Sequence, residues 1–404
     1  MLENKNIALY VTGGIAIYKV VDLMRDFIKR GANVRVAMTE SATEFVTPLT
    51  FQILSQREVH VDTFSEKTPG HVAHVDIADW SDMAVVAPAT ANTIAKMANG
   101  IADNFVTSSL LATTAPIFVV AAMNTDMYQN PITQENIQKL TGRGIYVVEP
   151  DTGFLAEGYE GKGRYPENSR IIDELEQYLV ASKEDLPLSG YKVIVSAGGT
   201  KERIDPVRYI TNDSSGKTGH AIAEAAYKNG AEVTLVTTSD LPASRAITTI
   251  RVESAKEMYH AIDSHFEATD ILIMSAAVSD YGVATTSDSK MKKNGQSDDL
   301  QIELVENPDI LKTMGEKKKT QFLVGFAAET DNLEEYAKRK LVEKNLDLIV
   351  ANEVGREDRG FNVDDNAVTI FSDEHHKLEV PKTSKKNIAN ILISKIISEL
   401  GIDN

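Results

Sequence analysis

Two patterns of apolar and polar positions alternate along the chain. Short, mostly apolar runs, typical of buried β-strands, precede longer stretches with an apolar position every third or fourth residue, typical of amphipathic helices. The first such segments are an apolar run at 7–11, a glycine turn at 12–14, a helical stretch at 15–29 and a second apolar run at 34–38. This strand–turn–helix–strand order predicts the opening of a parallel α/β sheet.

The same alternation continues through two halves of the chain. The first half adds predicted strands at 83–87, 117–121 and 145–148 and predicted helices near 91–98, 103–113 and 169–181. The second half restarts with strands at 191–196, 232–237, 270–274, 321–325 and 346–350, helices near 217–229, 254–266, 331–344 and 384–399, and a terminal hairpin of 367–371 with 377–380. The fold class predicted is therefore α/β, with two doubly wound, Rossmann-like domains whose sheets are mostly parallel.

The domain boundary follows from a short polar segment. A length of 404 residues suggests two or three domains at roughly 150 residues each. Residues 182–189 read SKEDLPLS, so we predict domains at 1–181 and 190–404 with 182–189 as their linker. A Gly-rich polar stretch without clear period at 151–168 is predicted to be a mobile loop or lid.

Composition excludes several classes of function. The chain has no apolar run near the ~18–20 residues of a membrane span and no signal-peptide pattern, so we expect a cytoplasmic protein. A net charge of −17 argues against non-specific nucleic-acid binding. The lack of cysteine excludes disulfides, thiolate metal sites and cysteine nucleophiles. His71 and His74 lie three residues apart without nearby carboxylates, which is a weak metal pattern.

Polar loops follow several strands of the first half. Gly13 and Gly14 follow the first strand, Thr39 follows the second, and residues 87–92 and 121–124 follow two more. In a doubly wound sheet such loops meet at one edge, where ligands bind. Glycines let the backbone approach a ligand, and a helix start favours an anion, although the glycine pair alone also fits a plain tight turn.

These loops carry a family resemblance. Residues 11–16 (VTGGIA), 88–92 (PATAN) and 122–128 (AMNTDMY) resemble the motifs of flavin-dependent cysteine decarboxylases. Over nearly all of 5–400 the chain is similar to the bifunctional phosphopantothenoylcysteine decarboxylase/phosphopantothenate–cysteine ligases of coenzyme A biosynthesis. The resemblance implies FMN as cofactor.

Carried over by position, the resemblance makes His74 the catalytic base and Asn124 the group that holds the substrate carboxylate. It implies flavin contacts by Gly13, Gly14, Ile15, Thr39, Pro88, Ala89 and Thr90. In this family the flavin oxidises the cysteine thiol to a thioaldehyde, whose C=S group accepts the electrons left by decarboxylation. Without the resemblance, His74 would fit a partly buried core histidine and Asn124 a turn residue.

One position departs from the family. Where the family's lid commonly carries a cysteine that protonates the final intermediate, this chain has Glu157. Glu157 donates that proton if the closed lid raises its pKa by desolvation. The alternative, left open here, is that Glu157 is a solvated lid residue and another group or water donates.

The second half holds a segment that superficially resembles a P-loop, at 214–218 (SSGKT). The P-loop spacing requires a glycine at position 211, where this chain has Thr211, so we reject an ordinary P-loop ATPase. Residues 205–217 instead closely resemble the ligase family's signature. This likeness implies that Asn212 handles the acyl intermediate.

The resemblance also implies a CTP site in the second half. It makes Lys290 catalytic and assigns CTP contacts to Asp280, Lys290, Pro308, Asp309, Ile310, Leu311, Phe326, Lys340 and Lys344. Each residue has an ordinary alternative: Lys290 fits a solvated basic loop, Asp280 a turn cap, and Lys340 with Lys344 a charged helix face. Lysines near strand ends in an acidic chain nevertheless favour a local anion site.

The product of the implied ligase reaction is the substrate of the implied decarboxylase. CTP converts 4′-phosphopantothenate to an acyl-cytidylate and releases pyrophosphate, L-cysteine attacks, and lysines with Mg²⁺ offset the phosphate charge. The resemblance also implies a homo-oligomer, a dodecamer, with flavin pockets at subunit boundaries. Two rival functions remain, a flavin-binding regulatory or electron-transfer protein and a ligase with an inactive decarboxylase scaffold.

Overall fold

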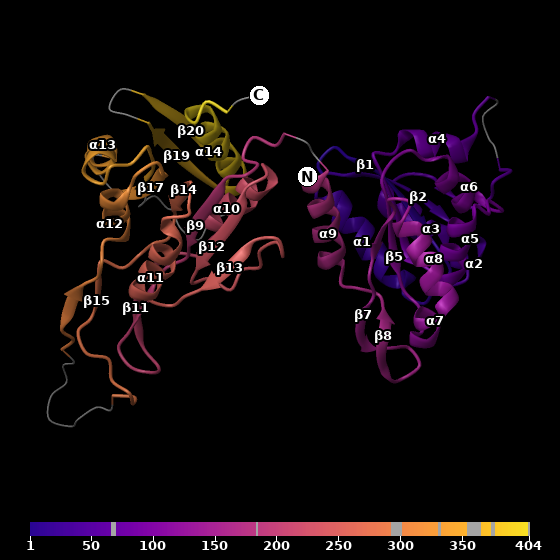
Figure 1. Ribbon diagram of the computed structural model, residues 1–404, viewed down its shortest axis with the longest axis horizontal. Coiled ribbons are helices and arrows are strands. Elements are labelled where there is room, and N and C mark those ends of the chain that lie inside the picture. The colour runs from indigo at the N-terminus through magenta and orange to yellow at the C-terminus, as the bar shows by residue number, and fades with distance from the viewer. Residues whose placement is uncertain are drawn as a thin grey trace. The chain divides into compact units, whose positions relative to one another are not determined.

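The computed structural model describes residues 1–65, 70–182, 185–291, 301–329, 333–353, 365–372 and 376–402. The chain divides into two compact units, Met1–Leu179 (unit 1) and Val180–Asn404 (unit 2), which Figure 1 shows as two groups of helices around sheets. Each unit has one large, mostly parallel sheet. The predicted α/β fold class is confirmed, and none of the helices in the described residues is long and apolar enough to cross a membrane.

The sheet of unit 1 has six parallel strands in the order β3-β2-β1-β4-β5-β6. Its strands are β1 (Asn6–Val11), β2 (Asn33–Met38), β3 (Val59–His60), β4 (Met83–Ala89), β5 (Ile117–Ala121) and β6 (Tyr146–Val148). Successive strands are added on one side of β1 up to β3 and on its other side from β4 onward. The carboxyl ends of β1 and β4 therefore form the switch point where such sheets bind ligands.

Side-chain alternation along β1 explains the layers of unit 1. Ile7 and Leu9 belong to the core cluster that includes residues of α1 and α9, whereas Ala8 and Tyr10 belong to the cluster with residues of α5 and α6. All four are fully buried, as expected for a strand covered on both faces. The helices are α1 (Ile17–Lys29), α2 (Glu40–Thr43), α3 (Pro48–Ser55), α4 (Ala73–Trp80), α5 (Ala91–Asn99), α6 (Phe105–Ala112), α7 (Thr125–Gln129), α8 (Pro131–Thr141) and α9 (Asn168–Ala181).

The prediction of a loop without regular structure at 151–168 is wrong, because part of this stretch forms two paired strands. The antiparallel strands β7 (Asp151–Phe154) and β8 (Glu160–Arg164) form a hairpin that stands out beside α7 in Figure 1. The hairpin lacks the apolar alternation of a strand because it docks through glycines onto the segment before α7. This docking cannot be read from the local pattern.

The sheet of unit 2 has eight strands in the order β13-β12-β9-β14-β17-β18-β19-β20. Its pairings are parallel except for the last two, β18 with β19 and β19 with β20, so β19 alone runs opposite to the other strands. The strands are β9 (Lys192–Ala197), β12 (Glu232–Thr237), β13 (Thr248–Arg251), β14 (Ile271–Met274), β17 (Phe322–Glu329), β18 (Leu348–Glu353), β19 (Asp365–Phe371) and β20 (Lys377–Ser384). The switch point lies between β9 and β14. The structure confirms the terminal hairpin, as β19 and β20.

The helices of unit 2 cover both faces of its sheet. They are α10 (Lys217–Lys228), α11 (Ala255–Phe266), α12 (Ile310–Lys317), α13 (Leu333–Glu343) and α14 (Lys385–Glu399), with small pairs of strands at β10 (Lys201–Arg203) with β11 (Tyr209–Thr211) and β15 (Tyr281–Val283) with β16 (Leu304–Glu306). One core cluster includes residues of α10 and α14, which pack against each other; the other includes residues of α11, α12 and α13. Figure 1 shows α14 beside β19 and β20, and α10 beside β9 and β12. Leu188, in the predicted linker, is buried in the first of these clusters.

Candidate active sites

A cavity of about 620 Å³ opens at the switch point of unit 1. Its walls come from the loops after β1, β4 and β5, from α1 and from the β7–β8 hairpin. The predicted residues that line it are Gly13, Gly14, Ile15, Pro88, Thr90, Asn124 and Glu157. Residues that are far apart in sequence thus converge where the strand-end rule places a ligand.

A buried threonine joins the two strand ends below this cavity. The Thr12 hydroxyl donates to the Pro88 carbonyl oxygen at 2.6 Å and accepts from the Thr90 amide at 3.1 Å. Gly13 must be glycine because a Cβ atom there would lie 2.6 Å from Ser41 Cβ. At Gly14 the same atom would lie 3.6 Å from Pro88, an ordinary contact. Gly13 therefore serves packing, whereas Gly14 leaves backbone open towards the cavity.

Asn124 lines this cavity and forms hydrogen bonds with the β7–β8 hairpin. Its Oδ1 caps α7 by accepting from the Asp126 amide at 2.9 Å. Its Nδ2 donates to Glu157 Oε1 at 3.1 Å and to Tyr159 Oη at 2.7 Å. Both protons of the amide are thus directed at the hairpin turn, and a bound carboxylate would replace these partners.

Two glycines let the hairpin approach the Asn124 segment closely. A Cβ at Gly161 would collide with Thr125 Oγ1, and one at Gly163 with the Met123 carbonyl oxygen. The Met123 amide donates to the Gly163 carbonyl at 3.0 Å. Glu157, at the turn, is exposed and contacts Asn124. Its candidate role as a proton donor stays a prediction.

His74, Thr39 and Ala89 are not among the residues that line the cavity. His74 lies in α4 with its ring edge-on to Phe105, at 6.2 Å between centroids, and its Nδ1 is buried without a hydrogen-bond partner in the described residues. The Thr39 hydroxyl is also buried and without such a partner, and Ala89 is fully buried in β4. Unit 1 alone therefore does not bring its predicted base into the cavity.

Several lining residues escaped the sequence analysis. They are Lys19 from α1 and Arg164 and Tyr165 from the end of the hairpin. Burial raises the pKa of the Tyr165 phenol, so this hydroxyl stays neutral. Its Oη has no hydrogen-bond partner among the described residues. No sequence pattern predicted that Tyr165 lines the cavity, because its position depends on how the hairpin folds back.

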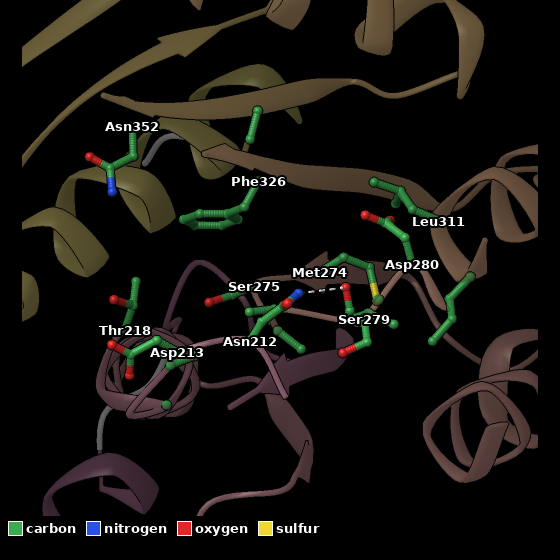
Figure 2. Close-up of a pocket in the computed structure, with 18 of the residues that line it drawn as sticks. Asn212, Asp213, Thr218, Met274, Ser275, Ser279, Asp280, Leu311, Phe326 and Asn352 are labelled. Atoms are coloured by element: carbon green, nitrogen blue, oxygen red, sulfur yellow. Dashed lines mark hydrogen bonds between the residues drawn. The ribbon is translucent and has the colours of Figure 1, made fainter. Parts of the chain in front are cut away.

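The cavity of unit 2 measures about 780 Å³ and also lies at a switch point. Every residue predicted to bind CTP lines it, except Lys290, and so does Asn212. Figure 2 labels Asn212, Asp280, Leu311 and Phe326 among them. These residues come from the loops after β11 and β14, from the start of α12, and from β17 and α13. Phe326 projects its ring into the cavity in Figure 2.

Asn212 is fixed against the loop after β14. Its Nδ2 donates to the Val278 carbonyl oxygen at 3.1 Å, drawn as a dashed line in Figure 2. The Ser279 amide in the same loop donates to the buried Thr200 hydroxyl at 2.9 Å. Gly199 is needed here because a Cβ would collide with the Asn212 carbonyl oxygen. These contacts place the Asn212 amide at the cavity wall.

Lys344 and Asp309, both predicted to contact CTP, pair with each other at 2.8 Å. Asp309 also caps α12 by accepting from the Lys312 amide at 3.0 Å. Burial opposes ionisation, but the Lys344 and Lys312 hydrogen bonds outweigh it and lower the pKa of Asp309. Asp309 therefore stays ionised at neutral pH and holds Lys344 at the cavity.

Lys290 is exposed and does not line the cavity. Its neighbour Met291 is held by the signature segment, because the Met291 amide donates to Asp205 Oδ2 at 3.2 Å. Asp205 is fully buried and accepts from Arg208 Nε at 3.0 Å. The Arg208 hydrogen bond, against the effect of desolvation, lowers the pKa of Asp205 far below its usual value. Asp205 and Arg208 thus hold the segment next to Lys290, and although both lie in the signature motif, the sequence analysis did not single them out.

Other unpredicted residues line the same cavity, namely Asn352 at the end of β18, Asn366 in β19 and Lys385 at the start of α14. The strand-end rule applied to β18 would have found Asn352. Within the described residues, no three His, Asp or Glu side chains gather as a metal site.

Comparisons with known proteins agree with this arrangement. The Flavoprotein family matches residues 1–180, and the family described as DNA/pantothenate metabolism flavoprotein C-terminal domain matches residues 188–400. Two doubly wound units, each with a cavity at its switch point, together with these matches, define a two-domain flavoprotein.

Full-length relatives narrow this class. The chain is 49% identical over 399 residues to the Coenzyme A biosynthesis bifunctional protein CoaBC of Bacillus subtilis (strain 168), covering 98% of this chain and 97% of that one. It is 41% identical to the protein of that name from Escherichia coli (strain K12), over 100% of this chain and 99% of the other. A crystal structure of the C-terminal domain of such a protein is 41% identical, covers 54% of this chain and 100% of its own, and has a TM-score of 0.46. The chain belongs to the CoaBC family of bifunctional coenzyme A biosynthesis proteins.

Proposed function

We propose that this chain carries out two successive reactions of coenzyme A biosynthesis. Unit 2 joins L-cysteine to 4′-phosphopantothenate with CTP, and unit 1 decarboxylates the resulting 4′-phospho-N-pantothenoylcysteine to 4′-phosphopantetheine with FMN. The observation that carries the proposal is the convergence of the carried-over residues. Asn124 and the glycine turn meet in one cavity, and Asn212 meets the predicted nucleotide contacts in the other.

The residues that line the cavity of unit 1 suit FMN chemically. Gly14 leaves its backbone open, Ile15 and Met127 supply apolar surface, and the start of α1, which has no side-chain cap, carries the partial positive charge that favours a phosphate. FMN, when bound, supplies the two-electron oxidation of the thiol. Asn124 holds the substrate carboxylate through Nδ2, and the closed hairpin excludes water.

His74 takes the thiol proton in this proposal. An imidazole suits this role because its ordinary pKa lies near neutrality. Since His74 lies outside the cavity lining of its own chain, a second copy must present it. This supports a homo-oligomer with decarboxylase sites shared between subunits, as the resemblance implies, and a dodecamer is its proposed form.

Unit 2 activates the carboxylate of 4′-phosphopantothenate. Transfer of the cytidylyl group makes an acyl-cytidylate and releases pyrophosphate, and the cysteine amine then displaces CMP. Asn212 contacts the acyl intermediate, while Lys340, Lys344 and the loop that bears Lys290 balance phosphate charge. Mg²⁺ is proposed to bind through the triphosphate.

Omission assays test the proposal. Purified protein should show bound flavin absorbance and, with 4′-phosphopantothenate, L-cysteine, CTP and Mg²⁺, release pyrophosphate and carbon dioxide. Omission of CTP should stop both products. Pyrophosphate alone would favour the ligase with an inactive scaffold, and flavin absorbance without either product would favour the regulatory protein.

A further inference from the structure

Backbone contacts fix the direction of the Asn124 amide in unit 1. Its Oδ1 accepts from the Asp126 amide at 2.9 Å and from the Met127 amide at 3.5 Å. Because both of these donors are backbone N–H groups, the amide oxygen faces α7 and the two Nδ2 protons face the β7–β8 hairpin. A ligand that Asn124 holds at this side is therefore bound through these two protons.

A carboxylate of the chain itself already accepts from one of these protons. Glu157 Oε1 lies 3.1 Å from Asn124 Nδ2, and Tyr159 Oη is the second acceptor, at 2.7 Å. Glu157 is the single acidic residue among the described residues that line the cavity. Its carboxylate thus contacts the same amide group that holds the substrate carboxylate in the proposed function.

The turn of the hairpin positions Glu157 for this contact. The Leu155 side chain is buried, and the Leu155 amide donates to the Tyr159 carbonyl oxygen at 2.8 Å. Gly158 has a φ of +89°, a conformation that favours glycine, and its amide donates to the Leu155 carbonyl oxygen at 3.0 Å. Glu157 therefore projects from a hydrogen-bonded turn.

Glu157 is not held by a cation in the described part of the chain, where it forms no ion pair. The cationic residues of β8 pair with carboxylates outside the turn, Lys162 with Glu149 at 2.8 Å and Arg164 with Glu167 at 3.3 Å. A hydrogen bond to a neutral amide is weaker than an ion pair would be, so a ligand can displace this carboxylate at modest cost.

From these contacts we propose that Glu157 is an internal competitor for the substrate carboxylate. The proposal rests on the function of unit 1 given above. The acidic substrate binds Asn124 only after the Glu157 carboxylate has left it, which lowers the affinity for the substrate. After carbon dioxide has left, Glu157 returns, so the amide protons are again paired. A ligand without this carboxylate leaves the contact between Glu157 and Asn124 intact.

Two unreactive ligands test this exchange in the flavin-loaded, full-length protein. 4′-Phospho-N-pantothenoylserine keeps the carboxylate but has a hydroxyl group in place of the thiol, and 4′-phospho-N-pantothenoylethanolamine lacks the carboxylate as well. Their binding to unit 1 is followed by the change in flavin absorbance. Glu157→Ala should bind the serine ligand about three- to tenfold more tightly, a modest gain because Glu157 is exposed, and the ethanolamine ligand as the wild type does.

Two controls separate competition for Asn124 from simple charge repulsion. Glu160→Gln removes a negative charge from the same hairpin, at an exposed position outside the cavity lining, and should leave both affinities unchanged. In an Asn124→Ala background the gain from Glu157→Ala should disappear, because the two carboxylates no longer share a donor. Glu157→Gln, which keeps an acceptor but loses the charge, should give a smaller gain than Glu157→Ala.

Unchanged or weaker binding of the serine ligand to Glu157→Ala would overturn the competitor. A gain that persists without the Asn124 side chain, or that extends equally to the ethanolamine ligand, would overturn it as well. In each of these cases carbon dioxide release by the wild type would still support the decarboxylase. Wild-type protein that neither retains flavin nor releases carbon dioxide would overturn the proposed function of unit 1 together with the competitor.

Discussion

The two cavities differ in how much of their predicted chemistry one chain supplies. Unit 2 gathers its predicted nucleotide residues, apart from Lys290, around a single switch point. Unit 1 gathers its glycine turn, Asn124 and Glu157, but leaves His74 outside the lining. The same kind of sheet therefore gathers most of the predicted residues in unit 2, whereas in unit 1 the proposed base has to come from a second copy if the proposal above is correct.

The largest expected effect tests this contrast in unit 1. His74→Ala removes a general base, and we expect carbon dioxide release to fall by about 10²–10⁴-fold. Asn124→Ala should cause a similar loss, because the carboxylate loses its amide donor. Pyrophosphate release, measured in the same reaction, should stay at the wild-type level for both variants.

Mixing the two inactive variants sharpens the comparison. If subunits share decarboxylase sites, co-assembled His74→Ala and Asn124→Ala chains form some sites with both residues intact, and carbon dioxide release returns in part. A mixture of His74→Ala with the double variant His74→Ala/Asn124→Ala contains no intact site and should stay inactive. Failure of the first mixture to recover, despite verified co-assembly, would mean that each chain supplies its own His74.

The glycine turn should separate packing from ligand approach. Gly13→Ala forces a Cβ against Ser41 and should destabilise unit 1 by about 1–3 kcal/mol, seen as a lower Tm. Gly14→Ala meets only ordinary contacts and should keep the wild-type Tm while it weakens flavin retention, measured by absorbance after dialysis. An equal loss of Tm in both variants would contradict this division of roles.

In unit 2 the buried Asp205 should control the Lys290 loop. Asp205→Asn removes the ionic partner of Arg208, and we expect the rate of pyrophosphate release to fall about tenfold. Glu267→Gln, at an exposed pair with Lys319, is the control and should leave the rate unchanged. A wild-type rate in Asp205→Asn would show that this anchor does not position the loop.

The pH dependence of the same anchor has a definite sign. Folding lowers the pKa of the Asp205 carboxyl group. The ionised carboxylate therefore stabilises the folded protein fully above its pKa in the unfolded chain, ~4, and this stabilisation is lost as the pH falls from there through the lower pKa of the folded state. The free energy of unfolding of the wild type should therefore exceed that of Asp205→Asn by a constant amount above about pH 4, and this difference should shrink at lower pH. Urea denaturation of both proteins across this range measures the difference.

The smallest effect is expected at the Lys344–Asp309 pair. Lys344→Met removes one of several cations and should raise the KM for CTP about threefold, since partly exposed charges are screened by solvent. Lys338→Met, which breaks the surface pair with Glu334 on the same helix, should leave this KM unchanged. Equal KM values for CTP in both variants would show that Lys344 does not contribute to CTP binding.

Most of the fold was predictable because the buried parallel strands are nearly continuous apolar runs. The strand at 83–87 became β4, with Thr90 where the strand-end rule placed a ligand. The hairpin β7–β8 was missed because Gly161 and Gly163 gain their stability from contacts with the Asn124 segment, a tertiary effect. Lys385 was missed because its burial depends on how α14 packs against α10.

The fate of the cysteine carboxyl carbon tests the central claim most directly. L-cysteine labelled with ¹³C at its carboxyl group is supplied with 4′-phosphopantothenate, CTP and Mg²⁺ to the flavin-loaded protein. The account predicts labelled carbon dioxide in an amount equal to the pyrophosphate released, and none without CTP. Pyrophosphate that accumulates while the label stays in the condensed product would contradict the claim that one chain performs both steps.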